Sequence, residues 1–166
     1  MGETVLKIRA FPDPVLRKKA MAVKEVTLGY HDILSRMAQA MYEHSGVGLA
    51  GPQVGISESL IVADIGSGLY KLINPRIIKR QGSQVTEEGC LSVPGVCVKV
   101  KRAKRIKLEA LDEEGKTISL EAQDLLAYVF QHEIDHLNGR LIIDHASLWK
   151  KLKIRKKLNA VCRLQL

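Results

Sequence analysis

The stretch His-Glu-Ile-Asp-His, residues 132–136, lies in a segment from about 122 to 138 whose apolar spacing predicts an α-helix. Residues four apart lie on the same face of a helix. His132 and His136 can therefore bind one metal ion, and Glu133 is close enough to exchange a proton with water bound to that ion. The alternative is a helical surface with two ordinary histidines, because so short a pattern also arises by chance.

A catalytic metal site of this type needs a third protein ligand and an open position for water. One common arrangement in zinc proteases places a histidine six residues after the second histidine, but position 142 is isoleucine. Another uses a glutamate from a later helix, whereas the only carboxylate side chain after His136 is Asp144, too near in sequence for a separate helix. His145 stays open as a ligand, although no motif supports it.

Two upstream segments supply further candidates. Cys90 lies in Glu-Glu-Gly-Cys-Leu-Ser-Val-Pro-Gly, residues 87–95, after a predicted strand and a glycine. Its thiolate is a strong ligand for zinc or ferrous iron. Residues 46–55, Gly-Val-Gly-Leu-Ala-Gly-Pro-Gln-Val-Gly, are glycine-rich but lack the Gly-Lys-Ser/Thr of a phosphate loop. We interpret this loop as bringing bare backbone and the Gln53 amide against a ligand.

The composition indicates one domain in a reducing compartment. With 166 residues and 46% hydrophobic content, the chain is long enough for one globular core. Three cysteines are too few for a disulfide scaffold and favour free thiols, which are buried unless their neighbours argue otherwise. The sequence shows no secretion signal and no apolar run of ~18 residues, so we expect a cytoplasmic protein with no membrane partner.

The net charge of +8 is concentrated near the C-terminus. Residues 146–166 hold seven basic side chains and no acidic one, which leaves 19 basic and 18 acidic residues in the rest of the chain. This tail can bind RNA, although solvated helix surface is an equal alternative. A second basic group, on predicted strands without interleaved aromatic residues, is interpreted as a solvated face: Lys99, Lys101, Arg102, Lys104 and Arg105.

The order of predicted elements indicates an α+β fold. A helix is expected at about 27–44, where apolar residues recur at helical spacing. A last helix is expected at about 148–161. Strands in succession followed by helices argue against alternating β/α units. Turn residues separate the strands expected at 60–63, 70–73, 82–86, 96–100, 105–111 and 117–120.

Taken together, three segments resemble the peptide deformylase family: the glycine-rich loop at 46–53, Glu-Gly-Cys-Leu-Ser at 88–92 and the helical motif at 132–136. They occur in the family's order and approximate spacing, and the likeness covers almost the whole chain. Two departures are visible. Gly51 replaces the second alanine of the family's loop, and Cys97 stands where relatives often have arginine, which puts a polar contact to a longer substrate in doubt.

The resemblance implies a fold and a hydrolase activity. Antiparallel β-sheets pack around the central metal-binding helix, residues 1–147 form the catalytic domain, and a basic helix at 148–166 belongs to the same domain. The reaction is removal of the N-formyl group from the initiator methionine of nascent polypeptides, with release of formate. The implied roles are metal ligation by Cys90, His132 and His136, proton transfer by Glu133, and donation to the oxyanion by the Gln53 amide and the Leu91 N–H.

The substrate site is expected beside the same helix. Positions one and two turns before His132 share its metal-bearing face. Their side chains, with a valine opposite, predict an apolar pocket for an unbranched methionine, although plain core residues are an equal alternative. Two glycines are expected to pair through their backbone with an extended peptide. The residues concerned are Leu125, Tyr128, Val129 and Val47 for the pocket, and Gly48 and Gly89 for the peptide.

The ligand set does not choose the metal. One thiolate and two imidazoles accept Zn2+, Fe2+, Ni2+ or Co2+, and the resemblance points to Fe2+. We expect Glu88 and Asp135 to accept hydrogen bonds from the ligand imidazoles. The other histidines are interpreted as ordinary surface or satisfied residues: His31, His44 and His145.

Two alternative functions stay open at this point. A general zinc endopeptidase would share the helical motif, but isoleucine at 142 and the Cys90 segment argue against it. An RNA-binding protein would account for the basic tail. The expected partners are N-formyl-methionyl peptides and, for the basic helix, ribosomal RNA, with no DNA.

Overall fold

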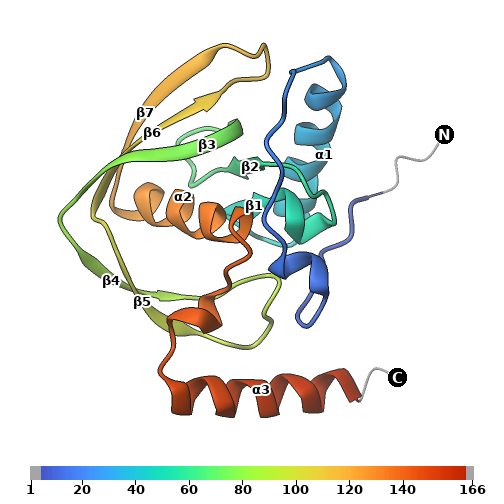
Figure 1. Cartoon of the computed structure of the whole chain (residues 1–166), viewed down its shortest axis with the longest axis vertical. Helices are drawn as coiled ribbons and strands as arrows, with labels where there is room; N and C mark the ends of the chain where they lie inside the picture. Colours follow the sequence, from blue (N-terminus) through green and yellow to red (C-terminus); the bar gives the residue numbers. More distant parts are fainter. Residues whose placement is uncertain (1–4, 164–166) are drawn as a thin grey trace.

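The computed structural model describes residues 5–163, with side chains described as far as Lys156. It confirms the predicted α+β class. Figure 1 shows strands curving around one helix, with a second helix beside the sheet and a third along one end. The helices are α1 (Gly29–Glu43), α2 (Asp124–Leu137) and α3 (Leu148–Arg163), with short 3-10 helices at Pro14–Arg17, Gly51–Val54 and Ile142–His145. The strands are β1 (Gly48–Ala50), β2 (Leu60–Ala63), β3 (Tyr70–Gln81), β4 (Gln84–Glu88), β5 (Val98–Arg102), β6 (Arg105–Leu111) and β7 (Thr117–Gln123).

The strands form two antiparallel sheets. The larger sheet has the order β1-β2-β3-β6-β7, and β4 pairs with β5 in the smaller one. Strand β3 leads into β4 past Gly82, which has a φ of 65°, and β5 leads into β6. The smaller sheet therefore continues the β3–β6 pair after a bend, and this bend lets the strands curve around α2 (Figure 1).

Strand β2 lies between α1 and α2 because both of its faces are apolar. Successive strand residues point to opposite faces of a sheet. Ile61 and Ala63 pack in the core cluster that contains Phe130 of α2. Leu60 and Val62 pack in a second cluster, with the buried residues of α1. Helix α2 is thereby supported by a strand that has no solvent-facing side.

Helix α2 is fixed inside the curved sheet by an aromatic contact and a side-chain amide. Phe130 is 0% exposed, and its ring meets the edge of the Tyr70 ring at a centroid distance of 5.4 Å. Gln131 binds both backbone groups of Ala103, in the bend between β5 and β6: it accepts from the N–H at 3.0 Å and donates to the carbonyl at 2.9 Å. These contacts hold the turns of α2 that carry His132 and His136 at a fixed depth within the curved sheet.

Strand β3 is longer than the segment predicted at 70–73. The sequence Asn74-Pro75 was expected to end it, and this prediction was wrong. Asn74 has a φ of 53°, and the pairing register shifts between Ile73 and Arg76, so the strand continues past an irregularity. The Asn74 side chain anchors this irregularity through both backbone groups of Val23, at 2.9 and 2.8 Å.

Other boundaries differ by small amounts. Helices α1 and α2 and strands β4 and β5 each begin two residues later than predicted. Asp124, the first residue of α2, has a φ of 51°, a conformation that sequence spacing does not reveal. Strand β1 was not predicted, because its three residues lie within the glycine-rich loop.

Candidate metal centre

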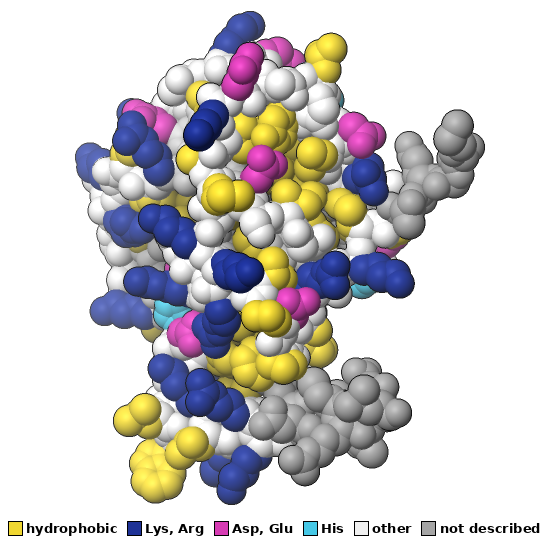
Figure 2. Space-filling view, turned by 45° about the vertical axis from the view of Figure 1, so that its right-hand side comes forward, with side chains coloured by type: hydrophobic (Ala, Val, Ile, Leu, Met, Phe, Trp, Pro, Cys, Tyr) yellow, Lys and Arg dark blue, Asp and Glu magenta, His cyan; other side chains and the backbone are white. Residues whose placement is uncertain are grey.

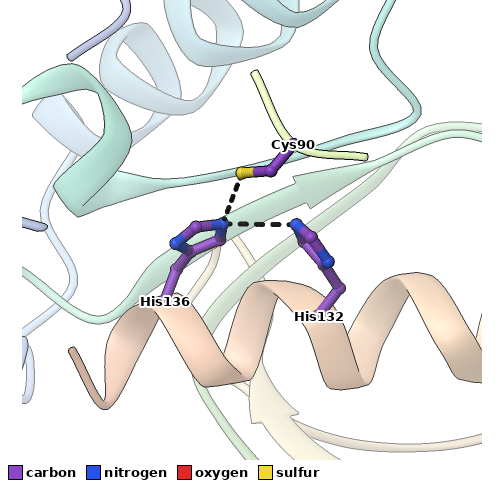
Figure 3. Close-up of side chains that lie close together, drawn as sticks. All are labelled: Cys90, His132 and His136. Carbon is purple, nitrogen blue, oxygen red and sulfur yellow. Dashed lines mark hydrogen bonds between the residues drawn. The ribbon is translucent and has the colours of Figure 1, made fainter. Parts of the chain in front are cut away.

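Three side chains from distant parts of the sequence meet beside α2. Figure 3 shows Cys90, His132 and His136 pointing toward one another. Cys90 Sγ lies 3.2 Å from His136 Nε2, and that nitrogen lies 3.3 Å from His132 Nε2. One ligand atom from each residue lies within 4.8 Å of the others, and both histidines are buried. The structure therefore brings together the three residues that the sequence suggested as ligands.

Cys90 reaches α2 because the chain turns sharply after β4. Glu88, the last residue of the strand, is fully buried. The Val93 N–H donates to the Cys90 carbonyl at 3.0 Å and closes a turn. The Phe11 N–H donates to the Ser92 carbonyl at 2.8 Å, so the N-terminal segment holds the same loop. These bonds fix the loop that directs the thiol at the helix.

A buried carboxylate orients His132. Glu88 Oε2 lies 3.0 Å from His132 Nδ1, and Arg102 donates to both Glu88 oxygens at 2.8 Å. Burial alone would raise the pKa of Glu88, but the hydrogen bonds from Arg102 and His132 lower it to about 2. An ionised Glu88 requires His132 Nδ1 to donate, which leaves Nε2 free as a metal ligand. The predicted role of Glu88 as an acceptor for a ligand imidazole agrees with this geometry.

Arg102 is a site residue that the sequence reading missed. The basic strand residues were predicted to face solvent, which is wrong for Arg102, since it is 6% exposed. Along β5, Val98, Val100 and Arg102 point inward, whereas Lys99 and Lys101 are exposed. The alternation with two valines was the signal that distinguishes the inward arginine from its neighbours.

Asp135 binds the arginine rather than a ligand imidazole, so the prediction for Asp135 was wrong. Its Oδ2 accepts from Arg102 Nη1 at 2.5 Å and lies 2.9 Å from His145 Nε2. His136 Nδ1 is buried and has no hydrogen-bond partner among the described residues. Burial lowers the pKa of His136 well below its usual value, so this ring is neutral and able to ligate.

Glu133 is buried beside the three converging side chains. It is 3% exposed, and its Oε2 has no hydrogen-bond partner within residues 5–163. Burial raises the pKa of Glu133 to about 7, although the charge of His132 acts in the opposite direction. A Cβ on Gly48 would collide with the Glu133 carboxylate and would lie 2.9 Å from Val129 Cγ1. Strand β1 can therefore pass this close only with glycine at 48.

Gln53 faces the same cluster from the 3-10 helix after β1. Its Oε1 accepts from the Ala50 N–H at 2.8 Å, and its Nε2 lies 3.6 Å from Cys90 Sγ. Because the oxygen is engaged by a backbone donor, the NH2 end of the amide must be the one that faces the thiol. The glycine-rich loop thus places an amide donor beside the ligands, as interpreted from the sequence.

The donor set fits a divalent ion of the zinc or iron type. The sulfur of the half-buried Cys90 and one nitrogen from each of two buried imidazoles lie within reach of a single centre. His132 presents Nε2 because Glu88 holds its Nδ1. The orphaned Glu133 oxygen provides an acceptor next to that centre. These features suit a catalytic site, in which one position stays open for water.

A cavity of about 420 Å³ opens beside the cluster. Its lining includes five of the six predicted substrate residues: Val47, Gly48, Gly89, Tyr128 and Val129, together with Gln53, Cys90, Leu91, His132 and Glu133. Leu125 is 49% exposed and does not line this cavity. Leu125 lies seven residues before His132 on α2, a rise of roughly 10 Å along the helix, so it lies beyond the pocket.

Cys97 is exposed, contrary to the expectation of a buried thiol, and Cys162 lies outside the described side chains.

A comparison with known protein families decides the identity of the fold. The model of the polypeptide deformylase family matches residues 5–152. The chain belongs to the peptide deformylase family. It is 49% identical over 143 residues to the peptide deformylase of Syntrophomonas wolfei, covering 86% of this chain and 94% of the relative. It is 46% identical over 158 residues to the enzyme of Thermotoga maritima, covering 95% and 96%.

Solved structures agree with this assignment. The crystal structure of a peptide deformylase from Legionella pneumophila superposes with a TM-score of 0.91 at 41% identity, over 98% of each chain. That of the Thermotoga maritima enzyme has a TM-score of 0.85 at 45% identity, over 87% of this chain and 99% of the other. The antiparallel sheets around α2 are therefore the deformylase fold.

The function follows from membership of this family. The chain is a metal-dependent hydrolase that removes the N-formyl group from the initiator formyl-methionine of nascent polypeptides and releases formate. A deformylase activity replaces the zinc endopeptidase considered from the sequence. Across residues 5–163, no helix offers an apolar stretch that would reach through a lipid bilayer.

Gly51, the departure from the family's loop, has a steric reason in this chain. A Cβ at this position would lie 2.7 Å from the Glu58 carbonyl oxygen and 2.8 Å from that of Ile56. Both neighbours are backbone atoms, which cannot move aside as a flexible side chain can. The turn that carries Gln53 is therefore packed more tightly than alanine permits.

Proposed function

We propose that Cys90, His132 and His136 hold the catalytic metal of this deformylase. The observation that carries the proposal is the convergence of the thiol and the two imidazoles within 4.8 Å, at the wall of a cavity. When bound, a divalent ion lowers the pKa of water toward neutrality and polarises a carbonyl oxygen. The remaining chemistry belongs to side chains and backbone groups of the protein.

Glu133 acts as the general base and acid. It accepts the proton of the attacking water and transfers it to the departing amine. A carboxylate whose pKa is about 7 can carry out both steps near neutral pH. Its unpartnered Oε2 and its place in the cavity lining support this role.

Two N–H donors stabilise the negative oxygen that develops on the formyl group. One is the Gln53 amide, whose NH2 end faces the cluster. The other is the Leu91 backbone N–H, which donates no hydrogen bond within the described part of the chain and lies in the loop that lines the cavity. Removing one donor of this kind typically costs about 3–4 kcal/mol in transition-state stabilisation.

The methionine side chain occupies the apolar part of the cavity. Val47, Tyr128 and Val129 line it and suit an unbranched thioether. The backbone of Gly48 and Gly89 pairs with the extended peptide on either side of the reacting group. We leave Leu125 out of this pocket because of its exposed position.

We further propose Fe2+ as the working metal and the cytoplasm as the compartment. The family resemblance and the thiolate ligand support iron, while the same donor set also accepts Zn2+, Ni2+ or Co2+. An iron–thiolate site that opens to a cavity is sensitive to oxidation, so it needs a reducing environment.

The metal and proton-transfer roles are tested by two variants prepared anaerobically with Fe2+. We expect Glu133→Gln to keep its full metal content and to release formate from a formyl-methionyl peptide at least about 100-fold more slowly. Cys90→Ala should lose stoichiometric metal. Exposed Glu121→Gln is the control and should match the wild type in both measurements. Loss of metal in Glu133→Gln, or full turnover with it, would contradict the assignment.

We also propose that residues 148–166 belong to the same domain as the catalytic residues 1–147 and bind ribosomal RNA. Ile154 of α3 is buried in a core cluster with Ile142 and Ile143, which supports a single domain. Figure 2 shows basic side chains gathered on the described part of α3. The exposed ones are Lys150, Lys153, Arg155 and Lys156, while Lys157 and Arg163 lie outside the described side chains.

Charge neutralisation separates this role from catalysis. Replacing Lys150, Lys153 and Lys156 together with glutamine should weaken co-sedimentation with ribosomes and reduce its salt dependence, while sparing cleavage of small peptides. The matched control is a triple glutamine variant of the exposed strand residues Lys79, Lys99 and Lys101. Unchanged co-sedimentation of the helix variant would exclude the proposal.

A further inference from the structure

Ser92 is a buried hydroxyl that the proposed chemistry leaves unused. It lies two residues after Cys90 and is 0% exposed. Its Oγ lies 3.3 Å from Gln53 Nε2, and this is the one side-chain hydrogen bond of Ser92 within residues 5–163. A fully buried hydroxyl whose partner is the amide donor of the site calls for a functional explanation.

The Gln53 amide is held at both ends. The Ala50 N–H donates to Oε1 at 2.8 Å, and Nε2 donates to Ser92 Oγ. A primary amide carries two N–H groups. Ser92 engages one of them, and the second lies on the side of Nε2 where Cys90 Sγ accepts at 3.6 Å and the cavity begins.

The need for a second anchor comes from the side chain itself. The terminal torsion of glutamine has broad minima rather than sharp ones. An amide fixed only at its oxygen can therefore swing its N–H groups through a wide range. With Ser92 as an acceptor for one N–H, the plane of the Gln53 amide has one orientation, and its second N–H has one direction, along the wall of the cavity beside Cys90 Sγ.

The distance between Gln53 and Ser92 is set by backbone bonds that do not involve the hydroxyl. The Arg9 N–H donates to the Gln53 carbonyl at 2.7 Å, and the Phe11 N–H donates to the Ser92 carbonyl at 2.8 Å. One N-terminal segment thus ties the two loops together. Replacing the hydroxyl by hydrogen removes one acceptor and leaves these ties in place.

We propose that Ser92 is a positioning residue that aims the second N–H of Gln53, the one beside Cys90 Sγ, at the oxygen on which negative charge develops. This rests on the proposed function of Gln53 as an oxyanion donor. Donors stabilise a transition state most when their orientation is fixed in advance. Because the charge develops only after the substrate is bound, Ser92 contributes to kcat rather than to KM.

A double-mutant cycle tests the proposal in the iron-loaded enzyme. We expect Gln53→Ala to lower kcat by about 100-fold. Ser92→Ala should lower kcat by about 10-fold, with KM and metal content changed by less than about twofold. In the Gln53→Ala background, Ser92→Ala should change kcat by less than about twofold, because its partner is gone.

Ser35→Ala is the matched control. Ser35 on α1 also accepts a side-chain hydrogen bond, from Lys71 Nζ at 3.0 Å, and does not line the cavity, so kcat should stay at the wild-type value. The same loss from Ser92→Ala in both backgrounds would overturn the proposal, and so would loss of metal or an unchanged kcat in Ser92→Ala. An unchanged kcat in Gln53→Ala would instead refute the donor role of Gln53 itself, and the positioning role with it.

Discussion

Two regions with different chemistry lie on either side of the candidate metal centre. The charged side, from β4, β5 and α2, consists of Glu88, Arg102 and Asp135, which are joined by hydrogen bonds of 2.5 to 2.8 Å. The neutral side, from β1 and the 3-10 helix after it, consists of the Gly48 backbone and the Gln53 amide. The charged side is built from ion pairs, whereas the neutral side contributes no charge.

The difference matches two separate tasks. On the charged side, Arg102 keeps Glu88 ionised, and Glu88 fixes the ring of His132, so charge is used to orient a ligand. On the neutral side, a buried carboxylate would repel the oxygen that becomes negative during hydrolysis, while an amide N–H stabilises it. Changes on the charged side should therefore alter stability and metal binding, and changes on the neutral side should alter turnover.

The largest effect is expected from Arg102→Met. This change leaves the fully buried Glu88 and the partly buried Asp135 without their shared cation. Removing one partner of a buried ion pair typically costs about 3–5 kcal/mol of unfolding free energy. Urea unfolding at matched metal content measures the loss. Exposed Lys101→Met, on the same strand, is the control and should lie within about 0.5 kcal/mol of the wild type.

A small stability loss in Arg102→Met would contradict the contrast between the charged side and the neutral side. It would mean that the carboxylates are neutral, or that water replaces the guanidinium. The charged side would then be no more than a polar surface, and its proposed part in orienting His132 would have no energetic support.

Local patterns explain what the sequence could predict, and pairings between distant residues explain what it could not. The spacing of His132 and His136 is a property of one helix, so it predicted correctly that the two imidazoles lie side by side. Asp135 was expected to accept a hydrogen bond from a ligand imidazole, and it is adjacent to His136 in sequence. Neighbours on a helix point about 100° apart, so Asp135 reaches Arg102 of β5 instead. That pairing depends on how strands and helix pack, which no local pattern encodes.

The fold, like the site, was predictable where a local pattern encodes it and not where it depends on distant contacts. Elements with a clear period were found, and four of them begin two residues later than predicted. The continuation of β3 past Asn74 depends on the Asn74 side chain binding Val23, which lies 51 residues earlier. A contact at such separation cannot be inferred from the turn-forming residues themselves, and those residues alone argue for an end to the strand.

A middle-sized effect is expected from Glu88→Gln. The amide keeps the shape of the carboxylate but loses the charge that Arg102 and His132 share. Loss of such an acceptor behind a metal-bound imidazole typically weakens metal binding by about 10- to 100-fold. Competition with a chelator under anaerobic conditions measures the change. Glu87→Gln, one residue away on the exposed face of β4, should bind the metal as the wild type does.

An unchanged metal affinity in Glu88→Gln would assign the charged side to folding alone. The comparison would be sharpened if affinity falls while kcat, measured at saturating metal, stays within about threefold of the wild type. That result would separate the orienting task from the chemistry.

The smallest effect on stability, and the most selective effect on turnover, is expected from Gly48→Ala. The added methyl group would meet the Glu133 carboxylate and Val129 Cγ1, so β1 or Glu133 must shift. Such strain typically costs about 1–3 kcal/mol, and the loss of chain freedom on replacing glycine returns about 0.4–1 kcal/mol. A net loss of about 1 kcal/mol is expected, with full metal content and formate release reduced at least about tenfold, because Glu133 is displaced. Gly29→Ala, where a Cβ meets no atom closer than 3.7 Å, is the control: it should keep full metal content and wild-type formate release, with stability raised by about 0.4–1 kcal/mol. If Gly48→Ala instead released the metal, the neutral side would also support ligation, and the division of tasks between the two regions would not hold.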